Sequence, residues 1–385
     1  MSDPKIEKAK KEKRERRFLK TWRHPVKAFL KLRFHYTCKT ESVPDGPFLL
    51  YANHVTDLDP VFVACSFDQP LVYVAGENVQ RMGKLSSLIR RYASTIDRVK
   101  GSTDSIAAMN ILRTLRSGRP VCMFPSGNRS FSGKSTDIFP ASAKLAIAAK
   151  VPLITYRLTG GYFTSPRWSD KMRCGKMHGE IVRVYTSEEL AIMQPEELLR
   201  QITNDLYEDA YAMEPVPYKG KKLAERLETM LYLCPKCGRI DTLISKDDTF
   251  SCSCGLCVKI NEYGRFEGSN VPFEHPGLWD EWQQAKMKAL ASAAAEAPLL
   301  ADEGQQLYRL DREHNLMPVT AGRMTLSGKE LVIGNSVFPI DFIDGIGLTQ
   351  QDKLSFTSRG ENYVIRSDHP RCGKKYYDLF RYLKN

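Results

Sequence analysis

The sequence predicts an α/β domain followed by two smaller modules, and three observations predict it. From about residue 47, short apolar runs alternate with helical patterns, as in a sheet covered by helices. Five of the ten cysteines fall between residues 234 and 257, which indicates a metal-bound module and not a disulfide framework. From about residue 306, short strand-like runs separated by turn residues indicate an antiparallel β domain with a final helix.

The first 44 residues form a basic arm. Residues 1–33 carry 13 Lys and Arg against 4 Asp and Glu, so +9 of the formal net charge of +12 lies there. Apolar residues recur among these cations at helical spacing, which predicts either an interfacial helix on an anionic phospholipid surface or a helical lid on the main domain; the two are compatible. The apolar residues are Phe18, Trp22, Val26, Phe29 and Phe34. Pro25 is predicted to divide the arm into two short helices.

The sequence shows neither a long apolar segment nor a secretory leader. No apolar run approaches the roughly 18 residues typical of a membrane-spanning helix. The first residues, Met-Ser-Asp-Pro and a Lys/Glu-rich run, lack an apolar core segment. We therefore expect a peripheral protein at the cytoplasmic face of a membrane.

The main domain is predicted to span residues 45–215. Its strands are expected at 48–52, 71–75, 121–124 and 153–158, and its helices near 60–68, 104–117, 141–149 and 195–213. Prolines at 215 and 217 mark its end. The remaining divisions are 216–268, a cysteine-rich ribbon with a leading helix near 219–230; 269–305, a helical connector; and 306–385, the β domain, whose strand pattern resembles a PH-like module.

A histidine and an aspartate follow the first predicted strand. In Asn53-His54-Val55-Thr56-Asp57-Leu58-Asp59-Pro60, four residues separate His54 from Asp59 at a strand end, where functional groups collect on α/β sheets. An imidazole can take the proton of an attacking hydroxyl, and a carboxylate can orient the imidazole. Asp59 before Pro60 is also what an ordinary helix N-cap looks like, and His54 can be a turn residue.

A second block, Phe124-Pro125-Ser126-Gly127-Asn128-Arg129-Ser130, follows the strand at 121–124. It resembles the Phe-Pro-Glu-Gly-Thr-Arg-Ser block of glycerolipid acyltransferases of the lysophosphatidate type. The family's other blocks occur in the same order: Asn-His-x4-Asp at 53–59, an arginine block at Ile96-Asp97-Arg98, and Val151-Pro152 before a later strand. The resemblance covers roughly residues 45–215 and implies a three-layer domain with a mixed sheet.

The resemblance also implies roles for these residues. His54 would be the base and Asp59 its partner, without a protein nucleophile. Arg98 and Arg129 would hold the phosphate of a lysophospholipid acceptor, because guanidinium groups suit phosphate oxygens. The acyl donor would be acyl-CoA or acyl-carrier protein. The remaining acceptor-binding residues would be Asn53, Ser126, Gly127 and Asn128.

The second block departs from the family's pattern at two positions. Asn128 stands where Thr is usual, and both suit a turn. Ser126 stands where Glu is usual, so a carboxylate is replaced by a small neutral hydroxyl. The alternative to an active enzyme is therefore a membrane-associated lipid-binding scaffold that has lost its activity.

The cysteine cluster predicts a structural zinc ribbon. Cys234 and Cys237 form a knuckle with Gly238, and Cys252 and Cys254 are the predicted second pair. Cys257 remains an alternative to Cys252, because Cys254-x2-Cys257 has the commoner spacing. A closed site of four thiolates has a structural role, and a redox pair is its rival. No nucleic-acid-binding motif accompanies the ribbon, so we do not expect a nucleic-acid partner.

Overall fold

The computed structural model describes residues 4–39, 43–76, 94–98, 105–293, 296–311, 315–349, 351–367 and 372–384. The chain divides into two compact units. Unit 1 comprises Met1–Arg98, Asp104–Pro166 and Met172–Lys219, and unit 2 comprises Val99–Thr103, Arg167–Lys171 and Gly220–Asn385. The finer five-part division remains a prediction.

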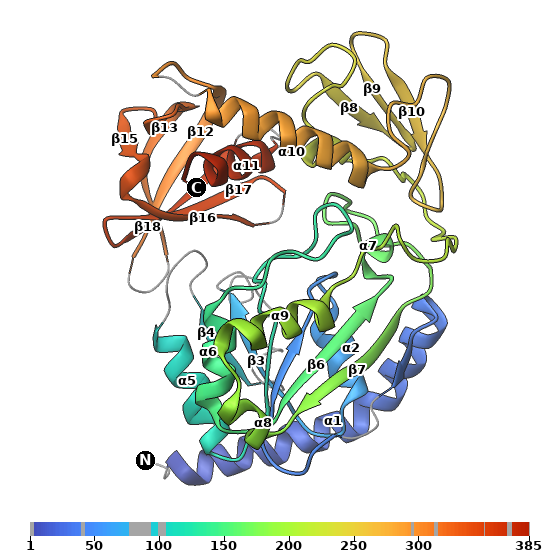
Figure 1. Ribbon diagram of the computed structural model, residues 1–385, viewed down its shortest axis with the longest axis vertical. Helices are drawn as coiled ribbons and strands as arrows, with labels where there is room; N and C mark the ends of the chain where they lie inside the picture. Colours follow the sequence, from blue (N-terminus) through green and yellow to red (C-terminus); the bar gives the residue numbers. More distant parts are fainter. Residues whose placement is uncertain are drawn as a thin grey trace. The chain divides into compact units, whose positions relative to one another are not determined.

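Unit 1 is built on a seven-stranded mixed sheet (Figure 1). The pairing is antiparallel only between β6 and β7; the other neighbours run parallel. The predicted α/β fold class with a mixed sheet is therefore confirmed. The strand order is β1 (Thr37–Lys39), β7 (His178–Tyr185), β6 (Leu153–Thr159), β2 (Leu49–Ala52), β5 (Val121–Met123), β3 (Val72–Gly76), β4 (Thr95–Arg98).

Helices cover both faces of this sheet. On β2, Leu49 and Tyr51 pack into one apolar core, and Leu50 and Ala52 pack into the other, as the alternation of side chains along a strand requires. The first core lies under α5 (Ser105–Arg116), α6 (Ala141–Ala149), α8 (Ser187–Ile192) and α9 (Pro195–Leu206). The second lies under α1 (Pro4–Phe34) and α2 (Asp59–Ser66). Both faces of the sheet are buried, which explains why its central strands are almost wholly apolar.

The basic arm is one helix, so the prediction that Pro25 would divide it is wrong. Packing on both sides of Pro25 holds α1 in place and offsets the lost backbone hydrogen bond. Glu15 is buried between Ser94 and Arg119, at 2.7 Å and 2.5 Å, and Leu30 and Phe34 enter the second core. Other apolar side chains of α1 stay exposed, among them Trp22, Phe29 and Leu32. The helix therefore both packs on the main domain and exposes apolar surface.

The first part of unit 2 is a four-stranded antiparallel sheet, in the order β11 (Phe266–Glu267), β10 (Cys257–Ile260), β9 (Thr249–Cys252), β8 (Leu243–Lys246). The helix predicted near 219–230 is absent: this described segment contains only the 3-10 turn η1 (Leu227–Thr229). Lys222 and Arg226 adopt positive φ angles of 60° and 70°, which interrupt a helix.

The second part of unit 2 is a seven-stranded antiparallel sheet with the C-terminal helix α11 (Gly373–Lys384), which confirms the β-rich C-terminal region. Its long first strand, β12, was not predicted, because Leu300–Leu310 is largely polar. The strand order is β15 (Ser336–Pro339), β14 (Glu330–Ile333), β13 (Leu316–Leu326), β12 (Leu300–Leu310), β18 (Glu361–Ser367), β17 (Lys353–Ser358), β16 (Ile343–Thr349).

Within residues 269–305, which were predicted to form a helical connector, lies the helix α10 (Pro276–Ser292), whereas β12 already begins at Leu300. The helix α10 joins the two parts of unit 2 through a buried polar cluster. Lys374 of α11 lies 2.7 Å from Asp280 of α10 and 2.6 Å from Asp378. Tyr232, just before the cysteine knuckle, donates to Asp378 at 2.8 Å. Trp279 donates to the carbonyl of Leu233 at 2.9 Å. These contacts make α10 part of the core of unit 2 and not a free linker.

Candidate active site

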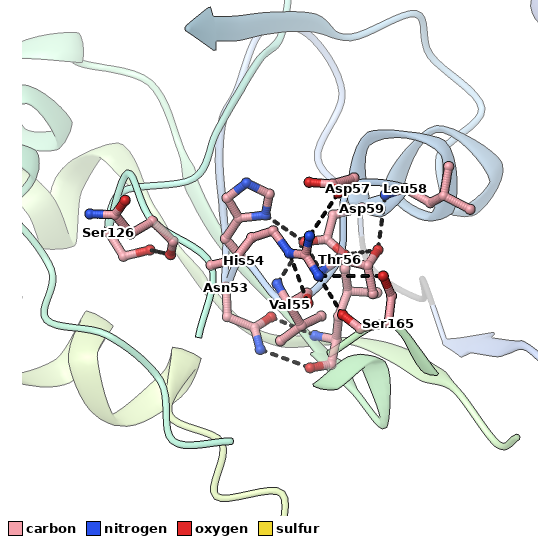
Figure 2. Close-up of polar contacts among 12 residues, drawn as sticks. Asn53, His54, Val55, Thr56, Asp57, Leu58, Asp59, Ser126 and Ser165 are labelled. Atoms are coloured by element: carbon pink, nitrogen blue, oxygen red, sulfur yellow. Dashed lines mark hydrogen bonds and ion pairs between the residues drawn. The ribbon is translucent and has the colours of Figure 1, made fainter. Parts of the chain in front are cut away.

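His54 and Asp59 meet just beyond the end of β2. Nδ1 of His54 lies 2.7 Å from Oδ2 of Asp59 (Figure 2). The side chain of Asp59 is fully buried, whereas that of His54 is 23% exposed. An ionised carboxylate only accepts hydrogen bonds, so Nδ1 carries the proton and Nε2 has the lone pair. The structure thus brings together the two residues predicted to form the catalytic pair.

Asp59 is not acting as an ordinary helix N-cap. An N-cap accepts from amides inside the helix, but the carboxylate of Asp59 accepts from residues that precede α2. The backbone amide of Val55 donates at 2.7 Å, that of Thr56 at 2.9 Å, and the Thr56 hydroxyl at 2.8 Å. One carboxylate therefore holds both the turn after His54 and the imidazole itself.

The ring of His54 is fixed by a second contact. It stacks on Phe124, with ring centroids 4.7 Å apart and an interplanar angle of 26°. Phe124 follows β5, the strand beside β2 in the sheet. Within the described part of the chain, no partner is recorded for Nε2 of His54. The imidazole of His54 is thus held at Nδ1 by Asp59 and on one ring face by Phe124, and it can accept a proton at Nε2.

Asn53 extends the sheet by one residue. Its Nδ2 donates to the carbonyl of Leu158, and its Oδ1 accepts from the Leu158 amide, both at 2.7 Å. The side chain thus mimics a strand backbone beyond the end of β2 and sets the start of the His54 turn. Because both groups of this buried amide are bonded to Leu158, the geometry favours a positioning role for Asn53 over the predicted contact with the acceptor.

Residues 125–130 form a tight loop after β5. Gly127, with a φ of 65°, donates its amide to the carbonyl of Phe124 at 3.0 Å, a conformation that suits glycine. Ser126 donates to the carbonyl of Asn128 at 3.1 Å. In Figure 2, Ser126 lies on the other side of His54 from Asp57 and Asp59. The hydroxyl at the family's Glu position is thus used inside its own loop.

Arg129 links this loop to two others. Its Nη1 lies 2.7 Å from a carboxylate oxygen of Asp57, its Nε contacts the carbonyl of Val55 at 3.4 Å, and its Nη2 donates to the carbonyl of Ser165. The next amide, that of Ser130, donates to the carbonyl of His54 at 3.2 Å. The predicted phosphate-binding arginine therefore lies beside the predicted base. The backbone of Arg98 ends β4, but its side chain lies outside the described residues.

Sequence reasoning missed Glu208, a buried carboxyl behind the site. It accepts from the amide of Gly160 at 2.9 Å, and Gly161 packs against Val55 so closely that an added Cβ would lie 2.3 Å from that side chain. The pKa of Glu208 is raised to about 8, chiefly by burial; the Gly160 hydrogen bond lowers the pKa, and the nearby charge of Asp59 raises it. A lone glutamate after a helix gives no sequence signal of burial.

In unit 2, the structure brings together the four predicted metal ligands, Cys234, Cys237, Cys252 and Cys254. Their sulfur atoms lie within 4.8 Å of one another; Cys234 and Cys254 are 3.7 Å apart, and Cys237 and Cys252 are 3.8 Å apart. Zn–S bonds of about 2.3 Å give a tetrahedron with edges of about 3.8 Å, so the thiols fit zinc. Cys257 is exposed and lies outside this group.

The surroundings of the cluster affect its thiols differently. A hydrogen bond from the Arg239 guanidinium lowers the pKa of Cys237 to about 6, whereas burial raises the pKa of Cys234 to about 12. A bound dication would hold all four as thiolates. Four protein ligands would leave no open position, which suits a structural site.

Residues 33–159 match the model of the Acyltransferase family. This segment contains His54, Asp59 and Arg129, so the site lies in an Acyltransferase-family domain, and the predicted resemblance is confirmed. The chain is also 26% identical over 153 residues to the "Probable 1-acyl-sn-glycerol-3-phosphate acyltransferase" of Mycoplasma pneumoniae, over 37% of this chain. The aligned part spans 57% of that relative's length.

A solved structure is similar as well. The crystal structure of the 1-acyl-sn-glycerophosphate (LPA) acyltransferase PlsC from Thermotoga maritima matches with 23% sequence identity and a TM-score of 0.43. The match covers 54% of this chain and 80% of that chain.

Proposed function

We propose that this protein is an O-acyltransferase that moves a fatty acyl group from a thioester, acyl-CoA or acyl-carrier protein, to the hydroxyl of lysophosphatidate or a related lysophospholipid. The observation that carries the proposal is the His54–Asp59 pair, 2.7 Å apart, within the Acyltransferase-family segment. The related protein of Mycoplasma pneumoniae, named as a probable 1-acyl-sn-glycerol-3-phosphate acyltransferase, supports the lysophosphatidate-type acceptor.

The proposed chemistry needs no protein nucleophile. Nε2 of His54 takes the proton of the acceptor hydroxyl while its oxygen attacks the thioester carbonyl carbon. Asp59, bound at Nδ1, stabilises the imidazolium that forms. When the tetrahedral intermediate collapses, the carbon–sulfur bond breaks and the imidazolium returns its proton to the sulfur. The products are the acylated acceptor and the free thiol.

The acceptor phosphate is assigned to the arginine side of the site. A guanidinium can bind two phosphate oxygens at once, and Arg129 is held next to His54 through the Ser130 amide. Arg98 remains the second proposed phosphate ligand. Gly127, Ser126 and Asn128 are proposed to shape the loop that carries Arg129, with Ser126 providing no charge at the family's Glu position.

The proposed substrates are membrane lipids, and α1 supplies a surface for reaching them. Trp22 and Phe29 are more than half exposed and stand seven residues apart, hence on one side of the helix. The exposed cations Lys20, Lys27 and Lys31 accompany them. Such a surface suits peripheral binding to anionic lipid. None of the described helices is both long and apolar enough to cross a bilayer.

Unit 2 is proposed to have a supporting role. The four-cysteine group would bind one structural Zn²⁺, and the buried cluster around Lys374 would join this ribbon to the C-terminal β domain. No residue of unit 2 enters the proposed chemistry.

The test is acyl transfer by the purified, zinc-loaded protein in detergent micelles. The donors are acyl-CoA and acyl-carrier protein; the acceptors are lysophosphatidate, glycerol 3-phosphate and uncharged lysolipids. We expect turnover with a phosphate-bearing lysolipid, and a loss of at least about 100-fold in His54→Ala, the lower end of the effect of a general base. His24→Ala, an exposed histidine of α1, is the matched control and keeps its activity.

Two outcomes would overturn the proposal. One is turnover that survives in His54→Ala. The other is an absence of transfer from folded protein with every donor and acceptor, combined with vesicle binding that the substitution leaves unchanged, which would identify a lipid-binding scaffold instead.

A further inference from the structure

The acceptor side of the site contains a carboxylate that the proposed chemistry does not use. Asp57 stands between His54 and Asp59 in sequence, yet its carboxylate accepts a hydrogen bond from Nη1 of Arg129. It is 81% exposed, whereas the side chain of Arg129 is only 11% exposed. Among the described residues, Arg129 is the recorded partner of this carboxylate.

Val55, Ser165 and Asp57 each contact the guanidinium of Arg129. Nε faces the carbonyl of Val55, and Nη2 faces the carbonyl and the hydroxyl of Ser165. Both are neutral groups of the folded framework. Nη1 faces Asp57, at 2.7 Å, the charged and solvent-exposed partner in this set. An anion that approaches Nη1 of Arg129 therefore meets the Asp57 carboxylate.

The contact between Asp57 and Arg129 is weak enough to be displaced. Ion pairs with an exposed member are weak, so a phosphate that binds the guanidinium in a forked geometry can compete with the carboxylate. Asp57 stays attached to the His54 turn after displacement, because Asp59 holds Val55 and Thr56 in place. A negative charge then remains beside the bound phosphate.

That remaining charge acts differently on different headgroups. A phosphomonoester carries up to two negative charges and is repelled by a neighbouring carboxylate. A phosphodiester that carries an ammonium group has one negative charge for Arg129 and one positive charge for Asp57. The arginine and the aspartate together are complementary to a zwitterion.

We propose that Asp57 is a specificity-determining residue that covers Arg129 in the free protein and selects acceptors with an amine-bearing phosphodiester headgroup over a bare phosphomonoester. This inference rests on the proposed function, because it assigns a headgroup class to the same acceptor site.

The test compares three short-chain lysolipid acceptors: lysophosphatidylethanolamine, lysophosphatidylglycerol and lysophosphatidate. The second is a phosphodiester without an amine, so it separates the effect of the amine from that of the diester. Asp57→Asn removes the charge and keeps the shape, and Asp57→Glu keeps the charge as the matched control.

In the wild type, we expect the highest kcat/KM with the ethanolamine acceptor. In Asp57→Asn, its advantage over the glycerol acceptor falls by up to about fivefold, and kcat/KM for lysophosphatidate rises by a similar factor, the upper limit for an exposed ion pair. Asp57→Glu keeps the wild-type order. Equal changes for all three acceptors, an unchanged ratio in Asp57→Asn, or a wild type that prefers lysophosphatidate would overturn the inference.

Binding separates this inference from the proposed function. The same acceptors are titrated calorimetrically into His54→Ala and into the double variant His54→Ala with Asp57→Asn, where no turnover is needed. A shift in relative affinities supports the inference even if no variant transfers an acyl group, and unchanged relative affinities overturn it even if the wild type is an active acyltransferase.

Discussion

Unit 1 and unit 2 each contain a cluster of ionisable side chains at nearly the same short distances, but only one of the two clusters is open to solvent. His54 and Asp59 are 2.7 Å apart, as are Lys374 and Asp280. In unit 2 the side chains of Lys374, Asp280 and Asp378 are each less than a tenth exposed. In unit 1 Asp59 is fully buried but His54 is 23% exposed.

The difference in exposure separates a cluster that stabilises the fold, around Lys374, from one that can take part in a reaction, around His54. Burial alone would lower the pKa of Lys374, but the two carboxylates raise it above its usual value, so the cation is held charged by its partners. Among the described residues, the hydrogen bond of His54 is made through Nδ1, and its side chain is 23% exposed, so the other nitrogen can act as a base. Short distances between charges are thus not sufficient to identify a site; an accessible reactive atom is also required.

The largest expected effect concerns the zinc ion that would stabilise the cysteine ribbon of unit 2, the unit that also contains the enclosed cluster of Lys374, Asp280 and Asp378. We expect removal of zinc by a chelator to abolish the amide protection of residues 231–260, because zinc binding supplies about 10–16 kcal/mol in small zinc modules. The measurement is hydrogen–deuterium exchange before and after zinc is added back. Cys257→Ser, outside the cluster, should keep its zinc, whereas Cys254→Ser should lose it. If the chelator left the amide protection of residues 231–260 unchanged, the assignment of a structural zinc site would be contradicted.

The next effect tests the enclosed cluster directly. Lys374→Met would leave Asp280 and Asp378 buried side by side, so we expect a loss of about 3–5 kcal/mol in the free energy of unfolding, measured by urea denaturation. Acyl transfer per folded molecule should not change.

Lys329→Met is the control for this loss. Lys329 pairs with Glu296 at the surface, where both side chains are more than half exposed, so its loss should cost at most about 1 kcal/mol. If Lys374→Met and Lys329→Met lost equal amounts of unfolding free energy, the distinction between enclosed and exposed charges would be wrong.

A smaller effect concerns Glu208, the buried carboxyl behind the open pair. Its pKa is raised from 4.5 to about 8 in the folded protein, so folding takes up a proton between these values. The contribution of Glu208 to stability is therefore fully present below pH 4.5 and is lost as the pH rises through about 8.

Glu208→Gln should flatten the fall in stability between pH 5 and pH 8 while keeping the acceptor for the Gly160 amide. The measurement is urea unfolding of both proteins at the two pH values. Glu188→Gln, at the exposed start of α8, should leave the slope as in the wild type. Identical slopes for wild type and Glu208→Gln would show that Glu208 is ionised throughout this range.

The sequence predicts those parts of the fold and site whose signal is local. His54 and Asp59 lie within six residues, and each cysteine pair is separated by at most two residues. Both groups can therefore be recognised in the sequence without knowledge of the fold. The buried strands β2, β5 and β6 are apolar runs, as a sheet covered on both faces requires.

The missed features depend on long-range packing. Strand β7 mixes charged and apolar residues next to the edge strand β1, and β12 is polar along most of its length. The helix α1 continues through Pro25 because the main domain holds both of its halves. Asp57 and Glu208 acquire their surroundings from Arg129 and Gly160, which lie 72 and 48 residues away in sequence.

The most direct test of the account measures acyl transfer and the free energy of unfolding on the same preparation of His54→Ala. We predict that turnover falls by at least about 100-fold while the free energy of unfolding stays within about 1 kcal/mol of the wild type. That result would show that the His54–Asp59 pair acts in catalysis and is not needed for the stability of the fold. The account would be contradicted if His54→Ala kept its turnover. It would also be contradicted if the loss of turnover were no larger than the fraction of unfolded protein explains.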